Sequence, residues 1–337
     1  MKIAIIGAGA IGGVVAAYLK KAGEEVVLIG REAQVDAINA QGLTIKGVRG
    51  TETIQVPART CLDQPYDLVI FAVKTQDIEE AFAANSEYLE KGLLLTTENG
   101  VQADNILSCH FDRDRQLSSI VMFGATYIKP GEIVFNFEGD WIIGRPLTPL
   151  DPTVHAIALV LSKSFKMVTS SQIMGQKYLK LFVNFNNCIP ALIGKSMQET
   201  FSDMDLCRLS VMLLKEGLEI VNQANMELVS LPDFPKERIY GLVHMPIEQA
   251  AGIINKTLTS LSREPLYGSI LQSIMRNKPS EIDFINGEAV QLGNHLKLPA
   301  TLNSKIVDMV HEVERTGKFF SVEDVKEMFN LRMENKL

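Results

Sequence analysis

The sequence has few cysteines and no excess of basic charge. Its four cysteines, at positions 61, 109, 188 and 207, form no C-x-x-C pair and share no metal-ligand spacing with the five histidines, so we expect a reducing, cytoplasmic location and no metal site. The sequence has 33 Lys and Arg residues and 40 Asp and Glu residues, so its net charge is −7. This balance argues against nucleic-acid binding and leaves room only for a local cationic pocket.

Charge is also missing from residues 3–19, which superficially suggests a signal peptide or a short membrane span. Four glycines interrupt this stretch, at positions 7, 9, 12 and 13. The stretch then runs into Lys20 and Lys21 without a convincing small-residue cleavage site. We therefore expect neither a targeting segment nor a membrane partner.

The length of 337 residues favours two domains. In the first part, short apolar runs alternate with amphipathic segments, which is typical of a parallel α/β sheet, and three runs within 119–145 predict antiparallel hairpins at the edge of this domain. After about residue 170, long helical patterns predict an all-α domain. The expected domains are 1–168 and 169–337, the expected strands include 3–7, 25–30, 67–73 and 93–100, and the expected helices include 11–22, 175–194, 204–226, 281–296 and 301–316.

The sharpest motif is G-x-G-x-x-G at residues 7–12, between a predicted strand and a predicted helix. In a Rossmann-type α/β domain the first glycine permits a tight turn, the second lets the backbone approach a pyrophosphate, and the third allows close helix packing. The alternative is a glycine-rich packing turn. We predict dinucleotide binding by Gly7, Gly9, Ala10, Ile11 and Gly12.

The residues after three further strands refine this hypothesis. Arg31 follows the second strand, where a guanidinium pairs with a 2′-phosphate and favours NADP, although the adjacent Glu32 would suit NAD if it pointed inward. Lys74 and Asn99 also follow predicted strands, at the sheet edge where ligands bind. Either one is equally compatible with an ordinary surface loop.

The predicted helix 175–194 carries polar groups on one stripe. On an ideal helical wheel Lys180, Asn184, Asn187 and Cys188 lie within one sector, surrounded by apolar residues. A solvated face is the default explanation for such a stripe. A partly buried lysine near a cofactor would instead have a lowered pKa and could serve as a general acid, with Lys177 as the competing candidate.

Residues 267–290 combine Ser269 with Glu281 at the start of another predicted helix. Ser280 is a candidate N-cap, and helix capping alone would explain Glu281. The residues by themselves do not decide between a cap and a catalytic group.

Taken together, these motifs resemble the ketopantoate reductase family, also called 2-dehydropantoate 2-reductases. The resemblance rests on GAGAIGG at the N-terminus, VKT at 73–75, ENG at 98–100, K-x-x-x-N at 180–184 and SILQ…PSEIDFING at 269–287. It implies NADPH-dependent reduction of 2-dehydropantoate to pantoate, in the route to pantothenate and coenzyme A. It also implies an NADP-binding first domain and a helical substrate-binding and catalytic second domain.

By position, the resemblance assigns roles to four residues of the second domain. Lys180 would polarise and protonate the keto oxygen, and Glu281 would position both the lysine and the substrate. Asn184 would orient the substrate, and Ser269 would hold its carboxylate or hydroxyl. On the cofactor side, the resemblance places Lys74 and Asn99 along the cleft and gives Arg31 the 2′-phosphate.

Two departures from the family pattern concern the substrate. Cys188 stands where a second asparagine is common, with Asn187 one residue earlier as its potential substitute, and Ser273 replaces a usual aspartate. A reductase of a related branched 2-keto acid therefore remains an alternative, as does a non-catalytic NADP(H)-sensing protein. The sequence leaves a homodimer open.

Overall fold

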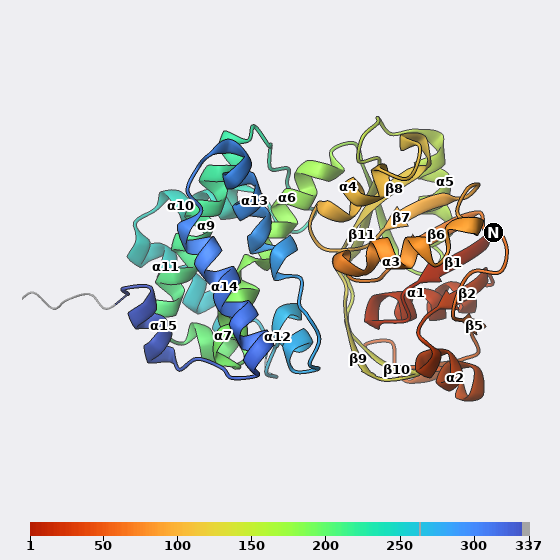
Figure 1. Ribbon diagram of the computed structural model, residues 1–337, viewed down its shortest axis with the longest axis horizontal. Coiled ribbons are helices and arrows are strands. Elements are labelled where there is room, and N and C mark those ends of the chain that lie inside the picture. Colours follow the sequence, from red (N-terminus) through yellow and green to blue (C-terminus); the bar gives the residue numbers. More distant parts are fainter. Residues whose placement is uncertain (263, 332–337) are drawn as a thin grey trace, which may run out of the picture. The chain divides into compact units, whose positions relative to one another are not determined.

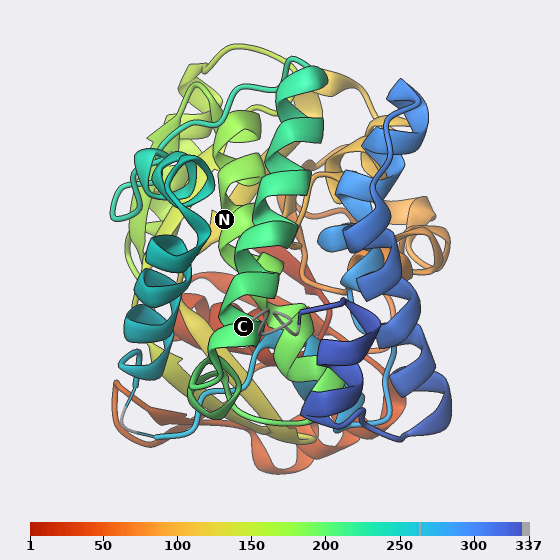
Figure 2. The same ribbon diagram turned by 90° about the vertical axis from the view of Figure 1, so that its left-hand side faces the viewer.

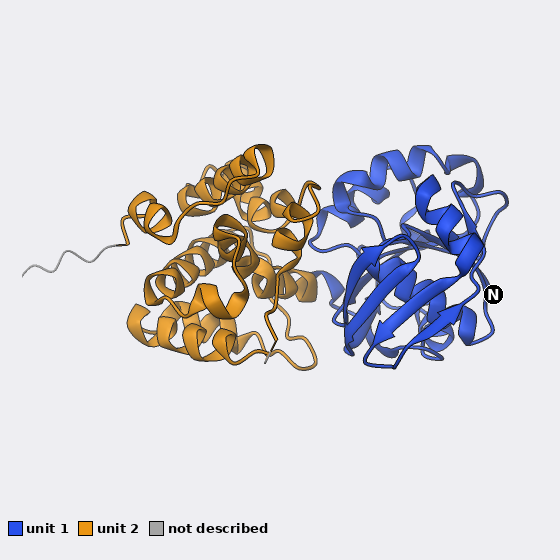
Figure 3. Cartoon of the chain, turned by 90° about the horizontal axis from the view of Figure 1, so that it is seen from below, with its two compact units in different colours: residues 1–174 blue, residues 175–337 orange. Residues whose placement is uncertain are grey.

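The computed structural model describes residues 1–262 and 264–331. The chain divides into two compact units, unit 1 comprising residues 1–174 and unit 2 beginning at Gly175 (Figure 3). Each unit is described separately below.

Unit 1 is built on an eight-stranded sheet with the order β12-β11-β8-β7-β6-β1-β2-β5 (Figure 1). Its neighbouring strands are parallel except for β8 and β11, so β11 and β12 form an antiparallel edge. This confirms the predicted α/β class. The strands are β1 (Lys2–Ile6), β2 (Glu25–Ile29), β5 (Ala58–Arg59), β6 (Leu68–Phe71), β7 (Leu93–Thr96), β8 (Gln116–Val121), β11 (Asp140–Gly144) and β12 (Lys166–Ser170).

Apolar clusters cover both faces of this sheet, as expected for buried parallel strands. All four residues of β6 are buried, which explains why its sequence is a continuous apolar run rather than an alternating one. The helices of unit 1 are α1 (Ala10–Lys21), α2 (Glu32–Gln41), α3 (Ile78–Ala83), α4 (Gln102–Ser108) and α5 (Pro152–Leu161).

A second, four-stranded sheet was not predicted. It has the order β4-β3-β10-β9, formed by β3 (Leu43–Gly47), β4 (Glu52–Ile54), β9 (Gly124–Lys129) and β10 (Glu132–Phe137). Strands β9 and β10 pair as an antiparallel hairpin, as expected for the runs within 119–145, but they do so in this second sheet, whereas β11 pairs antiparallel with β8 in the first sheet. The sheet packs against α1, where a Cβ on Gly13 would lie 2.1 Å from Cδ1 of Ile133, so any side chain at this position would force Ile133 to shift.

The described part of unit 2 is helical and contains no strand, only an isolated bridge between Leu231 and Phe234. Helix α9 runs lengthwise between α10 and α11 on one side and α13 and α14 on the other (Figure 2). Its helices are α6 (Ile173–Asn184), whose first two residues belong to unit 1, α7 (Cys188–Ile193), α8 (Met197–Phe201), α9 (Met204–Gln223), α10 (Glu237–His244), α11 (Ile247–Thr259), α12 (Ser269–Ile274), α13 (Asn286–Leu296), α14 (Thr301–Thr316) and α15 (Val322–Met328).

Two predicted helices of unit 2 are interrupted. The helix expected over 175–194 ends at Asn184, passes through a 3₁₀ turn at Phe185–Asn187 and resumes as α7. Pro190 accounts for the break, because it lacks an N–H and its ring would clash with the carbonyl of residue 186 in a regular helix. The helix expected over 281–296 begins only at Asn286, after a 3₁₀ turn at Ile282–Phe284 and a non-helical Ile285.

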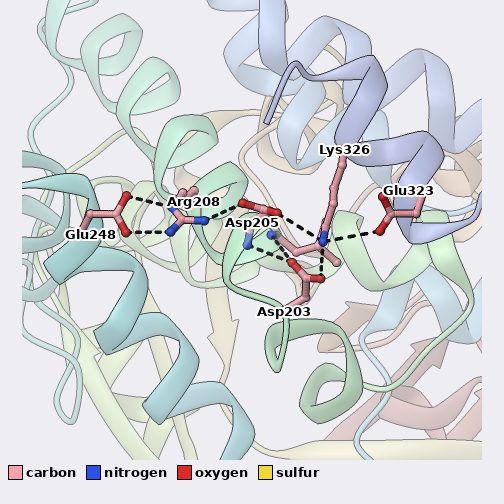
Figure 4. A network of polar contacts seen from close by, with 7 residues as sticks. Asp203, Asp205, Arg208, Glu248, Glu323 and Lys326 are labelled. Atoms are coloured by element: carbon pink, nitrogen blue, oxygen red, sulfur yellow. Dashed lines mark hydrogen bonds and ion pairs between the residues drawn. The ribbon is translucent and has the colours of Figure 1, made fainter. Parts of the chain in front are cut away.

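An ion-pair network joins α15 and α11 to the start of α9 (Figure 4). Asp203 caps α9, accepting a hydrogen bond from the Asp205 N–H at 2.9 Å. Lys326 of α15 lies 2.7 Å from the Asp203 carboxylate and 3.2 Å from that of Asp205. Arg208 then bridges Asp205 to Glu248 of α11. One turn of α9 thus anchors two helices that are distant in sequence.

None of the helices that the structure describes combines the length and the hydropathy needed to span a membrane.

Candidate active site

The glycine turn of unit 1 has a geometry that side chains would disrupt at two of its three positions. Gly7 has φ of +121°, and a Cβ there would lie 2.4 Å from the carbonyl oxygen of Ala72. A Cβ on Gly12 would lie 2.0 Å from the carbonyl oxygen of Gly7. At Gly9, by contrast, a Cβ would meet no atom within 4 Å. The protein's own packing therefore explains Gly7 and Gly12, but not Gly9.

The N-terminus of α1 opens at this turn. Gly9 is its N-cap residue, no side chain caps it, and its first turn contains no acidic residue. Ala10 and Ile11, which begin the helix, are only partly buried. Backbone N–H groups and a favourable helix dipole are what a pyrophosphate requires. With open space at Gly9, these residues fit a dinucleotide cofactor.

Two further loops meet the glycine turn at the carboxyl ends of the strands. Lys74 follows β6 and is partly buried, and Asn99 follows β7. The hydroxyl of Thr75 donates to the carbonyl oxygen of Asn99 at 3.5 Å, and the Thr97 hydroxyl donates to the Phe71 carbonyl at 2.8 Å. The structure thus brings the predicted cofactor-side loops together at one edge of the sheet.

Arg31 is held at the same edge by a contact that the sequence analysis missed. The Gln34 amide donates to the carbonyl oxygen of Ala8 at 3.0 Å, and its Oε1 accepts from the Arg31 N–H at 3.2 Å. Gln34 therefore ties the glycine turn to the start of α2. The Arg31 side chain itself is exposed, as is that of Glu32. No sequence motif predicts this role of Gln34, because its two hydrogen bonds depend on the close approach of Ala8 to Gly30 in the fold.

The two candidate lysines of α6 differ in their environments. Lys177 is buried, with 2% of its surface exposed, and it has an electrostatic or polar partner. Lys180 is partly buried, and burial lowers the pKa of its ammonium from 10.5 to about 8. Lys180 thus combines access to solvent with a proton that is released more easily than that of an ordinary lysine.

The asparagines that follow Lys180 are separated by the break in the helix. Asn184 is the last residue of α6, and Asn187 ends the 3₁₀ turn; both are partly buried. A Cβ on Gly268 would lie 2.7 Å from Oδ1 of Asn187, so Asn187 contacts the start of α12, where Ser269 is exposed. Asn187 and Ser269 are therefore neighbours, although 82 positions separate them.

Cys188 and Ser273, the two departures from the family pattern, both point into packed surroundings. Cys188 is fully buried, its thiol donates to the carbonyl oxygen of Phe185 at 3.0 Å, and burial raises its pKa to about 12. The hydroxyl of Ser273 donates to the Ser269 carbonyl oxygen at 3.0 Å. Neither side chain supplies a charge at neutral pH.

Glu281 lies just before the 3₁₀ turn that begins at Ile282, and it is partly buried. Its carboxylate does not cap that turn; instead, the hydroxyl of Ser280 accepts from the Ile282 N–H at 3.3 Å. The capping role that would have explained Glu281 is therefore carried by its neighbour.

Two family models match the chain. The model described as "Ketopantoate reductase PanE/ApbA" matches residues 3–147, and the one described as "Ketopantoate reductase PanE/ApbA C terminal" matches residues 172–314. A 2-dehydropantoate 2-reductase of Pyrococcus horikoshii is 29% identical over 94% of this chain and 99% of its own length.

Solved structures of ketopantoate reductases and of a dehydrogenase have the same fold as this chain. A PanE/ApbA family ketopantoate reductase from Ralstonia eutropha superposes with a TM-score of 0.79 and 25% identity, covering 94% of this chain and 99% of the other. A ternary structure of D-mandelate dehydrogenase with NADH and anilino(oxo)acetate reaches a TM-score of 0.80 at 20% identity, with the same coverage.

The fold and the glycine turn define a two-domain protein with a Rossmann-type N-terminal unit and a helical C-terminal unit. Within this class, the two family models together extend over both units in the order and spacing expected from the sequence motifs. The chain belongs to the ketopantoate reductase family.

Proposed function

We propose that this protein reduces 2-dehydropantoate to pantoate with NADPH. The observation that carries the proposal is Lys180, a partly buried lysine whose pKa is lowered to about 8 by burial. At neutral pH such a group is still mostly protonated, yet it is a stronger acid than an ordinary lysine. The names of the relatives and the family model support the choice of substrate.

In this proposal unit 1 binds the cofactor. The N-terminus of α1 and the open space at Gly9 receive the pyrophosphate, and Lys74 and Asn99 line the neighbouring loops. The bound nicotinamide supplies hydride chemistry at a carbonyl carbon. The remaining steps belong to the side chains of unit 2.

Lys180 donates a hydrogen bond to the keto oxygen, stabilises the negative charge that grows on it and delivers a proton to it. Glu281 positions the lysine and the substrate, and Asn184, Asn187 and Ser269 bind the substrate's polar groups. The contact of Asn187 with Gly268 supports a shared role for Asn187 and Ser269. Lysine and amide groups together suit a small, anionic 2-keto acid.

A second candidate substrate, another 2-keto acid, is favoured by one observation. Ser273 bonds to its own helix where the family usually has a carboxylate, so that charge is absent. The D-mandelate dehydrogenase whose structure contains NADH and anilino(oxo)acetate shares this fold, which supports testing substrates other than ketopantoate.

The decisive experiment monitors NADPH oxidation with a panel of 2-keto acids that includes ketopantoate. We expect ketopantoate to give the highest kcat/KM, and a better branched 2-keto acid would establish the second candidate instead. Lys180→Ala should lower kcat about 10²- to 10⁴-fold with little effect on NADPH affinity. The matched variant Lys177→Ala tests the neighbouring lysine; if it shows the larger loss, the general acid is misassigned. Tight NADPH binding without turnover of any keto acid would contradict the reductase proposal.

The preference for NADPH rests on Arg31, which the structure leaves exposed at the end of β2 without an ion-pair partner among the described residues. Arg31→Ala should weaken NADPH binding about tenfold or more and NADH binding much less, because only NADPH carries the 2′-phosphate. Glu32→Gln is the matched control. Equal losses for both cofactors would remove Arg31 from phosphate recognition.

A further inference from the structure

Two residues of α14 hold the segment on either side of Glu281. The carboxylate of Glu314 accepts a hydrogen bond from the Ser280 N–H at 2.7 Å through Oε1. Its other oxygen lies 2.9 Å from Nδ1 of His311. The second ring nitrogen of His311, Nε2, lies 2.9 Å from the Asp283 carboxylate. Ser280 and Asp283 are thus both bonded to side chains of α14, and Glu281 lies between them in the sequence.

This geometry requires a charged histidine. A neutral imidazole has one N–H donor and one acceptor nitrogen, so one of the two carboxylates would face a lone pair at 2.9 Å. Only the imidazolium donates to both. The Asp283 and Glu314 contacts raise the pKa of His311 above 6.5, against the opposing effect of burial.

The charged groups that face the His311 ring are Asp283, from the 3₁₀ turn, and Glu314, from α14 itself. Asp308 and Arg315 lie one turn before and one turn after it on α14. The ring and Asp283 are about half exposed, whereas Ser280 is buried. The imidazole can therefore exchange its proton with solvent while the segment that it holds remains packed.

We propose that His311, with Glu314, is a charge-dependent positioning residue for Glu281. This inference rests on the proposed function, in which Glu281 positions lysine and substrate. A neutral His311 donates to only one of the two carboxylates. When it keeps the contact with Glu314, the contact with Asp283 is lost, so the turn that follows Glu281 loses this connection to α14, while Ser280 still bonds to Glu314. Substrate positioning is then less exact, and catalysis is weakened.

The kinetic test compares His311→Gln with the wild-type protein at each pH from 6 to 9. We expect the ratio of their kcat/KM values to be about 0.1–0.2 at pH 6, the loss that a small misplacement causes, and to approach 1 near pH 9, where wild-type His311 is neutral as well. Because both proteins contain Lys180, its titration cancels in the ratio. His155→Gln, at an exposed histidine of α5, is the matched control and should give a ratio near 1 throughout. A ratio that is low and independent of pH would reduce His311 to a structural role and overturn the proposal.

The contacts of His311 with Asp283 and Glu314, together with the Glu314 bond to Ser280, form a clamp on the Glu281 segment. An NMR titration tests this clamp without any turnover. The His311 ring, identified by its missing signal in His311→Gln, should titrate above pH 6.5, and Asp283→Asn should lower its midpoint. The backbone amide of Glu281 should shift with the same midpoint in the wild-type protein and not in His311→Gln. A Glu281 amide that ignores this titration would overturn the inference. If no 2-keto acid is turned over while both signals titrate together, the proposed function fails and the clamp stands.

Discussion

Replacing Lys180 by methionine should stabilise unit 2 at neutral pH while removing the proposed general acid. The pKa of Lys180 is lowered in the folded protein, so its charged form is disfavoured by folding. Below pH 8 the ammonium is charged in both states, and the folded state bears the full desolvation cost. Between about 8 and 10.5 the folded protein binds fewer protons than the unfolded chain, so stability rises with pH.

The size of this effect follows from the shift itself. Each pKa unit corresponds to about 1.4 kcal/mol, so lowering the pKa from 10.5 to about 8 sets a ceiling of about 3 kcal/mol. Lys180 is only partly buried, and water screens part of this cost. We therefore expect Lys180→Met to gain about 1–2 kcal/mol at pH 7, or roughly 3–6 °C in Tm for a unit of this size.

Thermal unfolding of both proteins at pH 7 and pH 10 measures this difference. The gain should shrink at pH 10, because the wild-type lysine is then largely neutral in the folded state. Lys177→Met, on the same helix, is the matched control; it should lose stability at both pH values, because the buried Lys177 is engaged with a polar or electrostatic partner. A gain that is the same at both pH values, or a loss at pH 7, would refute the assigned desolvation of Lys180.

Three further predictions concern cofactor binding and stability. Gly9→Ala should leave Tm unchanged and raise the Kd for NADPH, because its Cβ would meet no protein atom within 4 Å. Gly12→Ala should lower Tm, because its Cβ would lie 2.0 Å from a backbone oxygen. Thermal melts and cofactor titrations of both variants measure these two effects. Asp104→Ala should cost about 2–4 kcal/mol in urea unfolding, because this buried carboxylate accepts from two buried hydroxyls at 2.7 Å, and an unchanged midpoint would contradict that reading. Lys326→Met should cost about 1–3 kcal/mol below pH 10, since Asp203 loses this cation and Asp205 keeps only its ion pair with Arg208, while Lys318→Met at an exposed position should be neutral by the same assay.

The parts of the fold that the sequence predicted well are those determined locally. The strand, glycine turn and helix of residues 2–21 follow from a short apolar run, a turn that needs positive φ at Gly7 and an uncharged helical stretch that is buried from Gly12 to Leu19 and ends in Lys20 and Lys21. Helix α14 was predicted with its observed bounds, because its apolar spacing is regular throughout. Both patterns arise within a few residues of the chain.

The second sheet escaped prediction for the opposite reason. Its central pairing joins β3 to β10, with Thr44 opposite Glu132, and no local pattern reports a partner so far away in sequence. The clamp on the Glu281 segment is equally non-local, since His311 contacts Asp283 across 28 positions. Residues whose role depends on a distant partner show no periodicity or motif of their own.

The break between α6 and α7 changes how the substitution at Cys188 is interpreted. On an unbroken helix Cys188 would share a stripe with Lys180, and the loss of an asparagine there would remove an amide from the candidate site. The turn forced by Pro190 instead directs Cys188 into the core, where its thiol bonds to Phe185, and leaves Asn187 against the start of α12. An amide is therefore retained beside Ser269, one position earlier in the chain. The difference in charge at Ser273 is then the stronger reason to test keto acids other than ketopantoate, because no neighbouring carboxylate on α12 replaces the one that is missing.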